Sequence, residues 1–514
     1  MSQNNVVGQS ACVLAKRIAA GEVSSVEVVE AHIACIEAVN PKINAVVVKR
    51  YDEARAEAKA ADAKRARGEA LGTLHGVPIT VKECLDLTGT PSTFGITTRA
   101  NHRADADELH VSRLRTAGAI VIGKTNVSQC LFYTEADNPL YGRTRNPWNL
   151  ERTPGGSSGG EGAIISAGGS PMGLGTDIGG SVRTPAAFCG IASLKPTSGR
   201  MDDPGEFSVP PGQRAIPSQV GVLARRVEDV ALGYRIAAQA ETPAVDVSKL
   251  RVSFYTDDGS FETAPAVRRA VNSAAQMLRD AGAQLQAWTP PNALEMYAVF
   301  GGILTADSCA YMKRITTGGP LTPQIKQMML GASIPPALLP MVRALLRAVG
   351  QHGLDFNLSA FGPPTTDRYW SLVQRIEKYR QDFLHALDVA SGGPFDLILA
   401  PAASLPAFTH GATRDLLTAG AYAPLYNLLG YPAGVVPLTR VQAGEESVRA
   451  VSSDAVVKLT RKIEQGSAGL PIGVQLIARP WQEHVALAAM AVVEKAARQR
   501  ADFPMTPKDI LESV

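Results

Sequence analysis

The sequence has few cysteines for its length, and their spacing does not suit a metal. Six cysteines are spread over 514 residues, without a CxxC pair or a cysteine and histidine cluster of zinc-binding type. Scattered cysteines of this kind fit the reduced thiols of a cytoplasmic protein. Cys84 and Cys130 lie close to the segments discussed below, but a catalytic thiol needs a neighbouring base, so we assign neither to catalysis. We expect no metal and no cofactor.

The sequence also lacks an excess of charge and a long hydrophobic run. The formal net charge is +3, and no block of lysine and arginine stands out, so we expect no nucleic-acid partner. No apolar run reaches the roughly 18 residues of a membrane span. The first residues do not have the basic and then apolar pattern of a signal peptide, so we expect none. A cytoplasmic protein that binds a small molecule fits these features.

The apolar segments that are present predict an α/β protein. Residues 24–47 read as a helix that begins with a capping box, Ser24 and Glu27, and ends before Pro41. Residues 395–403 read as a short buried strand that stops at Pro401. Helices and strands alternate between these segments without an internal repeat. We therefore expect a single α/β/α domain over residues 1–514, with a large central mixed sheet, and a long loop over residues 201–219.

Residues 320–350 stand apart as a predicted helical hairpin insertion. Residues 324–349 read as two short helices on either side of Pro335 and Pro336, and the second has a leucine-rich face with two arginines one turn apart. An amphipathic helix of this kind can lie on a membrane surface or gate an apolar substrate tunnel. It can equally contact a second copy of the chain in a homodimer, or pack in the core. The sequence leaves these alternatives open.

A block rich in glycine and serine, residues 155–181, reads "GGSSGGEGAIISAGGSPMGLGTDIGGS" and contains no histidine. Glycine loses much backbone entropy on folding, so this density indicates a site that backbone must approach closely. Serine ordinarily needs a base before it can act as a nucleophile. The block therefore raises the question of which serine reacts and which group activates it.

Two other motifs suggest different chemistry. Residues 118–125, "GAIVIGKT", match the phosphate-binding pattern GxxxxGK[ST], but their β-branched middle suits a buried strand better than a phosphate loop. Residues 155–159 fit the GxSxG elbow of Ser-His-Asp hydrolases, yet no hydrophobic strand precedes them. We expect the histidines that could complete such a triad on helix surfaces or in loops; they are His352, His385, His410 and His484.

The glycine and serine block, followed by "VRTPAAFCGIASLKPTSGR", resembles the amidase-signature family. The resemblance extends to "LHGVPITVKECLDLTG", "NPLYGRTRNPW", "LYNLLGYPAGVVPL" and "GLPIGVQLIARPWQE", and its details are most similar to the fatty acid amide hydrolase branch. It implies the fold of that family, with a signature core over residues 72–200. It also implies a Ser–Ser–Lys triad in which Ser181 is the nucleophile, Ser157 the proton relay and Lys82 the base.

The resemblance further implies how the triad is surrounded. The peptide bond between Gly156 and Ser157 should be cis. The backbone N–H groups of one turn should form the oxyanion hole; its residues are Ile178, Gly179, Gly180 and Ser181. Four further residues should support the triad: Ser158, Thr176, Asp177 and Arg183.

Elementary chemistry agrees with the role that the resemblance gives to Lys82. A lysine acts as a base only if its ammonium form is destabilised, and the apolar strand that leads to Lys82 predicts burial. Burial is equally compatible with a structural ion pair, for instance with Glu83. Neighbouring strand residues point to opposite faces, however, so we expect Glu83 to face away from Lys82.

These features predict a serine amidohydrolase that cleaves a carboxylic amide through an acyl-enzyme, with a secondary esterase activity. A long-chain acyl amide and an aryl amide both fit; the sequence does not choose between them. The alternative within the family is the A subunit of a tRNA-dependent amidotransferase. Against it, Glu161 stands where a small residue is expected, and "MDDPGEF" replaces the sequence expected after residue 200. The sequence predicts a cytoplasmic protein, in which residues 324–349 can make a peripheral contact with a membrane.

Overall fold

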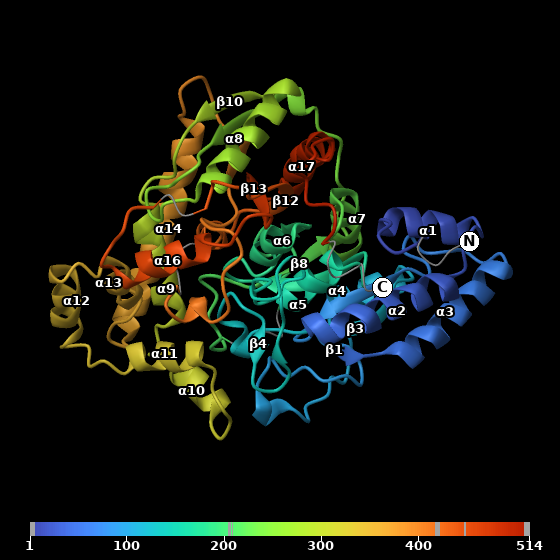
Figure 1. Ribbon diagram of the computed structural model, residues 1–514, viewed down its shortest axis with the longest axis horizontal. Helices are drawn as coiled ribbons and strands as arrows, with labels where there is room; N and C mark the ends of the chain where they lie inside the picture. Colours follow the sequence, from blue (N-terminus) through green and yellow to red (C-terminus); the bar gives the residue numbers. More distant parts are fainter. Residues whose placement is uncertain (1–5, 204–206, 208, 417–421, 447–448, 508–514) are drawn as a thin grey trace.

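One mixed sheet of eleven strands runs through the middle of the protein (Figure 1). The computed structural model describes residues 6–203, 207, 209–416, 422–446 and 449–507. The strand order is β1-β3-β2-β6-β8-β7-β12-β13-β11-β9-β10. The strands are β1 (Val46–Lys49), β2 (Pro78–Lys82), β3 (Ile120–Thr125), β6 (Met172–Asp177), β7 (Ala192–Lys195), β8 (Gln219–Ala224), β9 (Arg251–Phe254), β10 (Gln284–Ala287), β11 (Leu397–Pro401), β12 (Ala433–Arg440) and β13 (Pro471–Ala478), and a separate pair is formed by β4 (Asp137–Asn138) and β5 (Gly142–Arg143).

The inner strands are covered on both faces. Every residue of β2, β3, β6, β8 and β13 is buried, which requires helices above and below the sheet because alternate side chains point to opposite faces. Strand β2 pairs in parallel with β3 and β6, and β9 pairs in parallel with β10 and β11, whereas the other pairs are antiparallel. This confirms the expected α/β/α architecture with a large central mixed sheet.

The helices surround this sheet (Figure 1). They are α1 (Ala11–Ala19), α2 (Ser25–Ile43), α3 (Tyr51–Ala66), α4 (Leu109–Thr116), α5 (Gly159–Ser166), α6 (Arg183–Cys189), α7 (Val227–Ala238), α8 (Pro265–Asp280), α9 (Ala293–Leu304), α10 (Ala310–Thr316), α11 (Pro323–Ala332), α12 (Leu339–Ala348), α13 (His352–Leu358), α14 (Thr366–Asp388), α15 (Pro424–Leu428), α16 (Ala455–Glu464) and α17 (Glu483–Ala497).

Helix α2 begins as predicted but ends later. Ser24 and Glu27 form the expected capping box. The prediction that the helix stops before Pro41 is wrong, because α2 continues to Ile43. The N–H group that proline lacks matters little here: the next turn is closed by the N–H of Asn44, which donates to the carbonyl of Asn40 at 2.7 Å. The side chain of Asn40 accepts hydrogen bonds from the backbone N–H groups of Ala45 and Val46, just after the helix.

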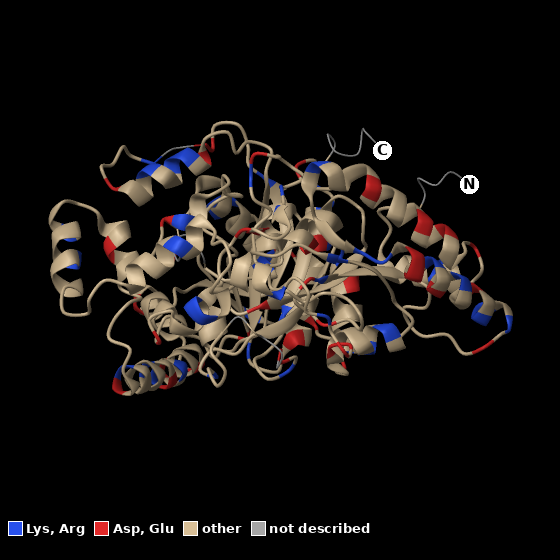
Figure 2. Ribbon diagram, turned by 90° about the horizontal axis from the view of Figure 1, so that it is seen from below, with Lys and Arg blue, Asp and Glu red and all other residues tan. Residues whose placement is uncertain are grey.

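The other segments predicted from the sequence are found in place. Strand β11 ends at Pro401, as the apolar run before it indicated. Within the predicted loop over residues 201–219, the described residues form no helix or strand before β8 begins at Gln219, and residues 204–206 and 208 lie outside the described residues. Two helices, α11 and α12, stand on either side of Pro335 and Pro336. Figure 2 shows residues of both charge signs interspersed along the described chain, as the small net charge suggested.

A buried carboxyl group joins helix α5 to the sheet. The side chain of Glu161 accepts hydrogen bonds from Thr80 of β2 at 2.7 Å and from Thr125 of β3 at 2.9 Å. It fills the space above Gly173 of β6, where a Cβ atom would lie 2.2 Å from a carboxyl oxygen. Burial raises the pKa of Glu161 to about 8, although the two hydroxyl groups and the charge of Lys82 lower it. Glu161 therefore keeps its proton at neutral pH in the folded protein.

This pKa predicts how stability changes with pH. Because Glu161 holds its proton up to about pH 8 in the folded chain and loses it near pH 4.5 when unfolded, its contribution to stability falls as pH rises from 5 to 8. Glu161→Gln removes this titration, which is worth up to about 1.4 kcal/mol per pH unit. Thermal unfolding at pH 5, 6, 7 and 8 should therefore show a smaller loss of stability in the variant than in the wild type. The exposed Glu151→Gln is the control; equal slopes in all three proteins would contradict the assignment.

Candidate active site

Three segments of the chain meet at one edge of the sheet. Strands β2 and β6 are parallel neighbours, so their carboxyl ends lie together, with Lys82 as the last residue of one and Asp177 of the other. Residues 155–158 reach the same place as the loop that leads into α5. The structure thus brings together the lysine and the serine-bearing turns that the sequence singled out.

The amine of Lys82 is fully buried among hydroxyl groups. Its Nζ lies 2.7 Å from Oγ of Ser157 and 2.7 Å from Oγ1 of Thr176. Glu83 faces away, as predicted: its carboxylate accepts hydrogen bonds from the backbone and hydroxyl of Thr93 and from the backbone of Phe94. Lys82 is therefore held by a serine and a threonine and not by its neighbouring carboxylate.

The loop that carries Ser157 fits only because it is built of glycine. The peptide bond between Gly156 and Ser157 is cis, as the family resemblance implied. A Cβ atom on Gly156 would lie 2.5 Å from the backbone nitrogen of Glu135, a distance that real Cβ atoms do not reach. A side chain at this position would push the loop, and with it Ser157, away from Lys82.

The turn that carries Ser181 is the accessible part of the site. Residues 152–177 are all buried, whereas Ile178, Gly179 and Ser181 are half-exposed. Gly180 has a φ of +111° and its position is crowded, since a Cβ atom there would lie 2.7 Å from the side chain of Ala423. A substrate can therefore reach Ser181, while Ser157 and Lys82 lie behind it.

Backbone N–H groups gather at this turn. Gly180 donates its N–H to Asp177 at 2.7 Å. Among the described residues, the N–H groups of Ile178, Gly179 and Ser181 have no protein acceptor. The carbonyl of Ser181 accepts a hydrogen bond from the N–H of Ser158 at 3.2 Å, but the hydroxyl groups of Ser157 and Ser181 are not within hydrogen-bond distance of each other in this structure.

An ion pair between Asp177 and Arg183 holds the turn in shape. Both side chains are fully buried and lie 3.0 Å apart. Asp177 also accepts hydrogen bonds from the N–H groups of Gly180 and Val182 and from the amide of Asn427. Although burial raises it, the charge and hydrogen bond of Arg183, the charge of Lys195 and the hydrogen bond of Asn427 hold the pKa of Asp177 well below its ordinary value. The carboxylate of Asp177 therefore stays ionised, and the ion pair holds Asp177 and Arg183 in fixed positions.

The four residues expected around the triad all contact it or its turn. Thr176 contacts Lys82, and the hydroxyl of Ser158 donates to the carbonyl of Thr176 at 3.3 Å. Asp177 and Arg183 form the ion pair just described.

Three residues that the sequence analysis did not assign also take part. Asn427 contacts Asp177 and Arg183, and Gln475 contacts Arg183 from β13. Phe300 of α9 lies against the turn, where a Cβ atom on Gly179 would be 2.8 Å from its ring. Asn427 and Gln475 lie in segments that carried the family resemblance, so their positions were marked although their roles were not. The sequence indicated only that the region over residues 300–360 shapes the acyl pocket, without singling out Phe300.

The competing motifs do not form alternative sites. Residues 120–125 are the buried strand β3, so the phosphate-loop pattern is a coincidence. His352 begins α13, His385 lies in the last turn of α14 and His484 lies in the first turn of α17. His410 contacts the carbonyl of Leu150. Within the described residues, no hydrogen bond joins any of the four to Ser157 or Ser181.

The described residues hold neither a metal-binding cluster nor a membrane-spanning helix. No group of three or more of their histidine, cysteine, aspartate or glutamate side chains is arranged to hold a metal ion. Each described helix is also too short or too polar to cross a membrane.

Comparison with known proteins shows the same relationship along nearly the whole chain. The model of the amidase family matches residues 27–487. Fatty-acid amide hydrolase 1 of Sus scrofa is 34% identical over 507 residues, which cover 94% of this chain and 84% of that protein. The A subunit of the glutamyl-tRNA(Gln) amidotransferase of Roseiflexus castenholzii is 30% identical over 533 residues, which cover 96% of both chains.

The solved structures give the same result. The structure of a fatty acid amide hydrolase superposes on this one with a TM-score of 0.83 at 26% sequence identity. The match covers 96% of this chain and 86% of the hydrolase chain. The chain is thus an amide-hydrolysing enzyme of the amidase signature family.

Proposed function

We propose that the protein is a serine amidohydrolase in which Ser181 forms an acyl-enzyme. The observation that carries this proposal is the placement of a half-exposed serine in a turn of unpaired N–H groups, in front of a buried contact of 2.7 Å between Ser157 and Lys82. A nucleophile must meet the substrate, whereas its base must be shielded from water. The two serines and the lysine are arranged in that order from the surface inward.

The reaction follows from this order. Lys82 acts as the base and accepts the proton of Ser157, while Ser157 accepts the proton of Ser181. The oxygen of Ser181 then bonds to the amide carbon, and the carbonyl oxygen becomes an oxyanion. Collapse of this intermediate breaks the C–N bond as the same relay returns a proton to the leaving nitrogen. Water repeats the sequence on the ester and releases the acid.

The N–H groups of the turn stabilise the oxyanion. Of the four expected donors, Gly180 already donates to Asp177, so Ile178, Gly179 and Ser181 supply the free donors. Removal of one such donor typically costs a factor of about 10² to 10³ in rate. The ion pair of Asp177 and Arg183 acts on catalysis indirectly, because it fixes the direction in which the N–H groups of the turn point.

A role as the A subunit of a tRNA-dependent amidotransferase is the less supported alternative. Identity to the fatty-acid amide hydrolase of Sus scrofa is 34%, against 30% to the amidotransferase chain of Roseiflexus castenholzii. Glu161, which replaces a small residue, is built into the sheet through Thr80 and Thr125. Isolation of a stable complex with a glutaminyl partner protein would favour the alternative.

The helical hairpin supports an apolar amide as substrate. In α12, Arg343 and Arg347 contact Asp355 of α13 at 2.7 and 3.1 Å, and both arginines stay partly exposed. Several large apolar side chains of the hairpin are also exposed; they are Leu330, Leu338, Met341, Leu345 and Val349, each between 46% and 63% exposed. A surface helix normally packs its apolar residues against the core, and a patch of this kind marks a contact with a membrane or another protein.

The hairpin also lies beside the catalytic loop. Gln324 of α11 donates a hydrogen bond to Glu135 at 3.3 Å, and the backbone of Glu135 packs against Gly156, next to Ser157. We therefore propose that the exposed face of α12 rests on a membrane surface, from which a long-chain acyl amide reaches Ser181. The alternative is that a second copy of the chain packs against this face.

The serine assignments can be tested with a fluorophosphonate probe. Ser181→Ala should abolish both turnover and labelling, because the nucleophile is missing. Ser157→Ala should leave an enzyme that is labelled slowly, since only the relay is lost. If Ser157→Ala stopped all labelling while Ser181→Ala retained it, the two roles would have to be exchanged.

The role of Lys82 predicts different losses for amides and esters. An amine leaves only after protonation, whereas an alkoxide needs less help, so Lys82→Ala should lose about 10²- to 10⁴-fold or more on an amide and less on the matched ester. Its rate should also rise with pH as hydroxide replaces the base. The measurement is kcat/KM for an amide and an ester with the same acyl group, from about pH 6 to 10. Equal losses and an unchanged pH profile would make Lys82 structural.

The hairpin proposal predicts a dependence on acyl chain length. Replacing Leu338, Met341 and Leu345 together by serine should lower turnover of a long-chain amide presented in vesicles by about tenfold or more, as the apolar contact is lost. Turnover of a short acyl amide should not change. Serine at Leu109 and Val389, which are exposed elsewhere, is the control. Equal losses on both substrates, or a loss accompanied by dissociation of a dimer, would favour a contact between copies.

A further inference from the structure

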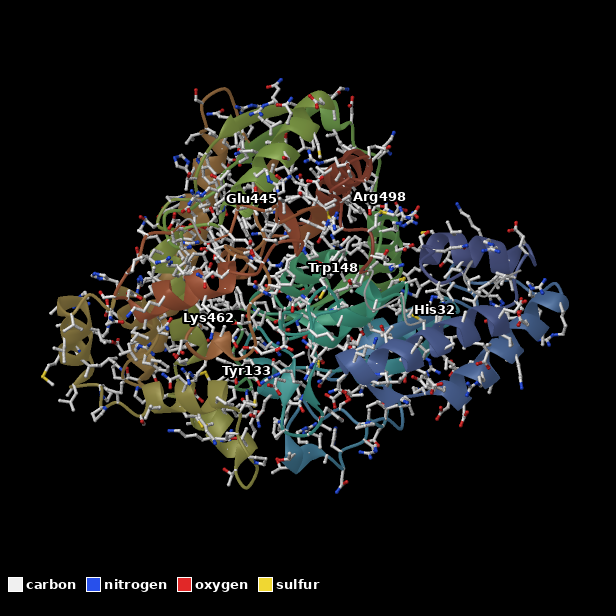
Figure 3. The ribbon with its side chains drawn as sticks, in the orientation of Figure 1. His32, Tyr133, Trp148, Glu445, Lys462 and Arg498 are labelled. Carbon is white, nitrogen blue, oxygen red and sulfur yellow. The ribbon has the colours of Figure 1, made fainter. Side chains whose placement is uncertain are left out.

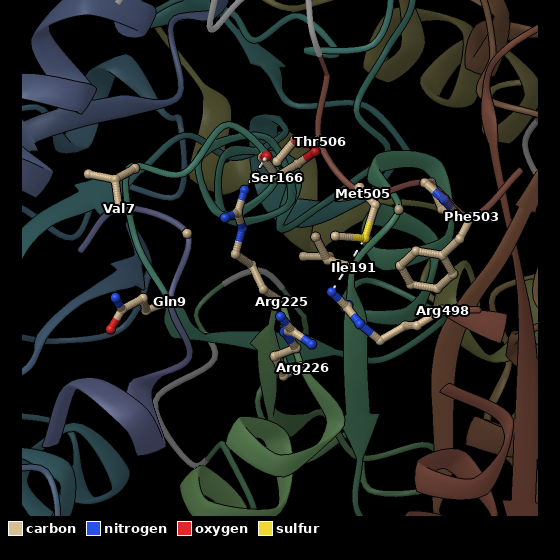
Figure 4. Close-up of a pocket in the computed structure, with 13 residues that line it drawn as sticks. Val7, Gln9, Ser166, Ile191, Arg225, Arg226, Arg498, Phe503, Met505 and Thr506 are labelled. Atoms are coloured by element: carbon tan, nitrogen blue, oxygen red, sulfur yellow. Dashed lines mark hydrogen bonds between the residues drawn. The ribbon is translucent and has the colours of Figure 1, made fainter. Parts of the chain in front are cut away.

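A pocket lined by three arginines lies away from the proposed active site. It has a volume of about 430 Å³ and is formed by residues 7–9 near the N-terminus, the ends of α5 and α6, the start of α7, and the segment after α17. Figure 4 shows the side chains of Arg225, Arg226 and Arg498 around the same space, and Arg498 is also labelled in Figure 3. A pocket of this size is in the range that small molecules occupy.

The positive charge in this pocket is not balanced by the residues that line it. Among the described residues of its walls, three are arginines and none is acidic. Among the described residues, Arg498 forms an ion pair with Glu494 at 4.0 Å, and Glu494 also accepts a hydrogen bond from the N–H of Val227. Burial, and then the neighbouring charges of Arg226 and Arg498, lower the pKa of Arg225 to about 10. Three like charges in one pocket favour an anion between them.

A purely structural role does not account for all three arginines. Arg225 donates one hydrogen bond, at 3.3 Å, to the carbonyl of Ser166, where it also complements the negative end of α5. This contact gives Arg225 a structural role. Among the described residues, the Arg226 side chain makes no hydrogen bond, and that of Arg498 makes one, to the sulfur of Met505 at 3.4 Å, besides its 4.0 Å ion pair with Glu494. Two guanidinium groups are therefore available to a ligand.

Three apolar side chains of the pocket lie on the side of Arg498 (Figure 4). They are Phe503, Met505 and Ile191, and the guanidinium group of Arg498 lies 5.0 Å from the ring centre of Phe503. Guanidinium groups bind phosphate through paired hydrogen bonds, and an aromatic ring in the ligand can lie against Phe503. The walls therefore match a molecule that is anionic at one end and apolar at the other.

We propose that this pocket binds an organic phosphate of about mononucleotide size, with its phosphate on the three arginines and its aromatic or apolar part on Phe503 and Ile191. The site is separate from Ser181. It lies at the carboxyl ends of α5 and α6, the helices whose amino ends follow Ser157 and Ser181, and the eight residues of α5 span about 12 Å.

Calorimetric titration at constant ionic strength tests this proposal. The probes are phenyl phosphate and AMP, with inorganic phosphate and phenol for the separate halves. Phenyl phosphate and AMP should bind at least about tenfold more tightly than inorganic phosphate, because the ring adds apolar contact. Phenol should not bind measurably. Equal affinity for phosphate and phenyl phosphate would overturn the assignment to an organic ligand, and no saturable binding of phenyl phosphate or AMP would overturn the site.

Variants connect the binding to these residues. Arg226→Gln and Arg498→Gln, which are half-exposed, should each weaken phenyl phosphate binding about tenfold or more. Arg235→Gln, on the exposed face of the same helix α7, should bind like the wild type. Ser181→Ala should also bind normally, since the pocket is remote from that residue. Undiminished binding in both pocket variants, or its loss in Ser181→Ala, would place the ligand elsewhere.

Discussion

The geometry of the site depends on one buried ion pair, that of Asp177 and Arg183. Asp177 is the last residue of β6 and Arg183 the first of α6, so the pair closes the turn between them and fixes where Ser181 points. A buried carboxylate without its cation would be strongly destabilised. Two backbone N–H groups and the amide of Asn427 also donate hydrogen bonds to this carboxylate, so Arg183 is not the only group that stabilises its charge. A single pair thus joins a strand, a turn, a helix and a distant loop.

The glycine-rich block provides the close approaches that surround this pair. Gly156 allows the loop of Ser157 to pass against the backbone of Glu135, and Gly173 leaves room for the carboxyl group of Glu161. At their far ends, α5 and α6 are tied together by Trp148, which lies near the middle of the molecule in Figure 3. Its indole N–H lies within hydrogen-bond distance of the hydroxyl of Ser166 and the carbonyl of Cys189. Both serines therefore lie in loops that lead into short helices whose far ends are tied together.

Charge and apolar surface are placed unusually in two other parts of the molecule. In α12 the arginines pair with Asp355, while Met341 and Leu345 are exposed, which suits an apolar surface. Behind α5 and α6, arginines gather in a pocket without acidic side chains among its described lining residues, which suits an anion. Neither feature is needed to hold the serines in place, so each is best explained by something that binds there.

The sequence alone predicted the architecture, which the structure confirms, and it singled out the residues of the proposed site. Continuous apolar runs such as residues 119–122 favoured buried strands covered on both faces. The glycine and serine block, with its resemblance to amidases, marked Lys82, Ser157 and Ser181, and the family itself follows from the match over residues 27–487. Local sequence was less reliable at the end of α2, where side-chain hydrogen bonds of Asn40 sustain a helix that Pro41 was expected to stop.

Only the tertiary structure decided which distant groups meet. Phe300, Asn427 and Gln475 reach the serine turn from far along the chain, and no local pattern predicts such contacts. The orientation of α12 was likewise left open, because periodicity gives an apolar face but does not say what it faces. The three arginines of the pocket are separated by up to 273 positions in the sequence, so they form one site only after the chain has folded. A sequence records the residue types at each position, whereas burial and charge balance depend on which positions the fold makes neighbours.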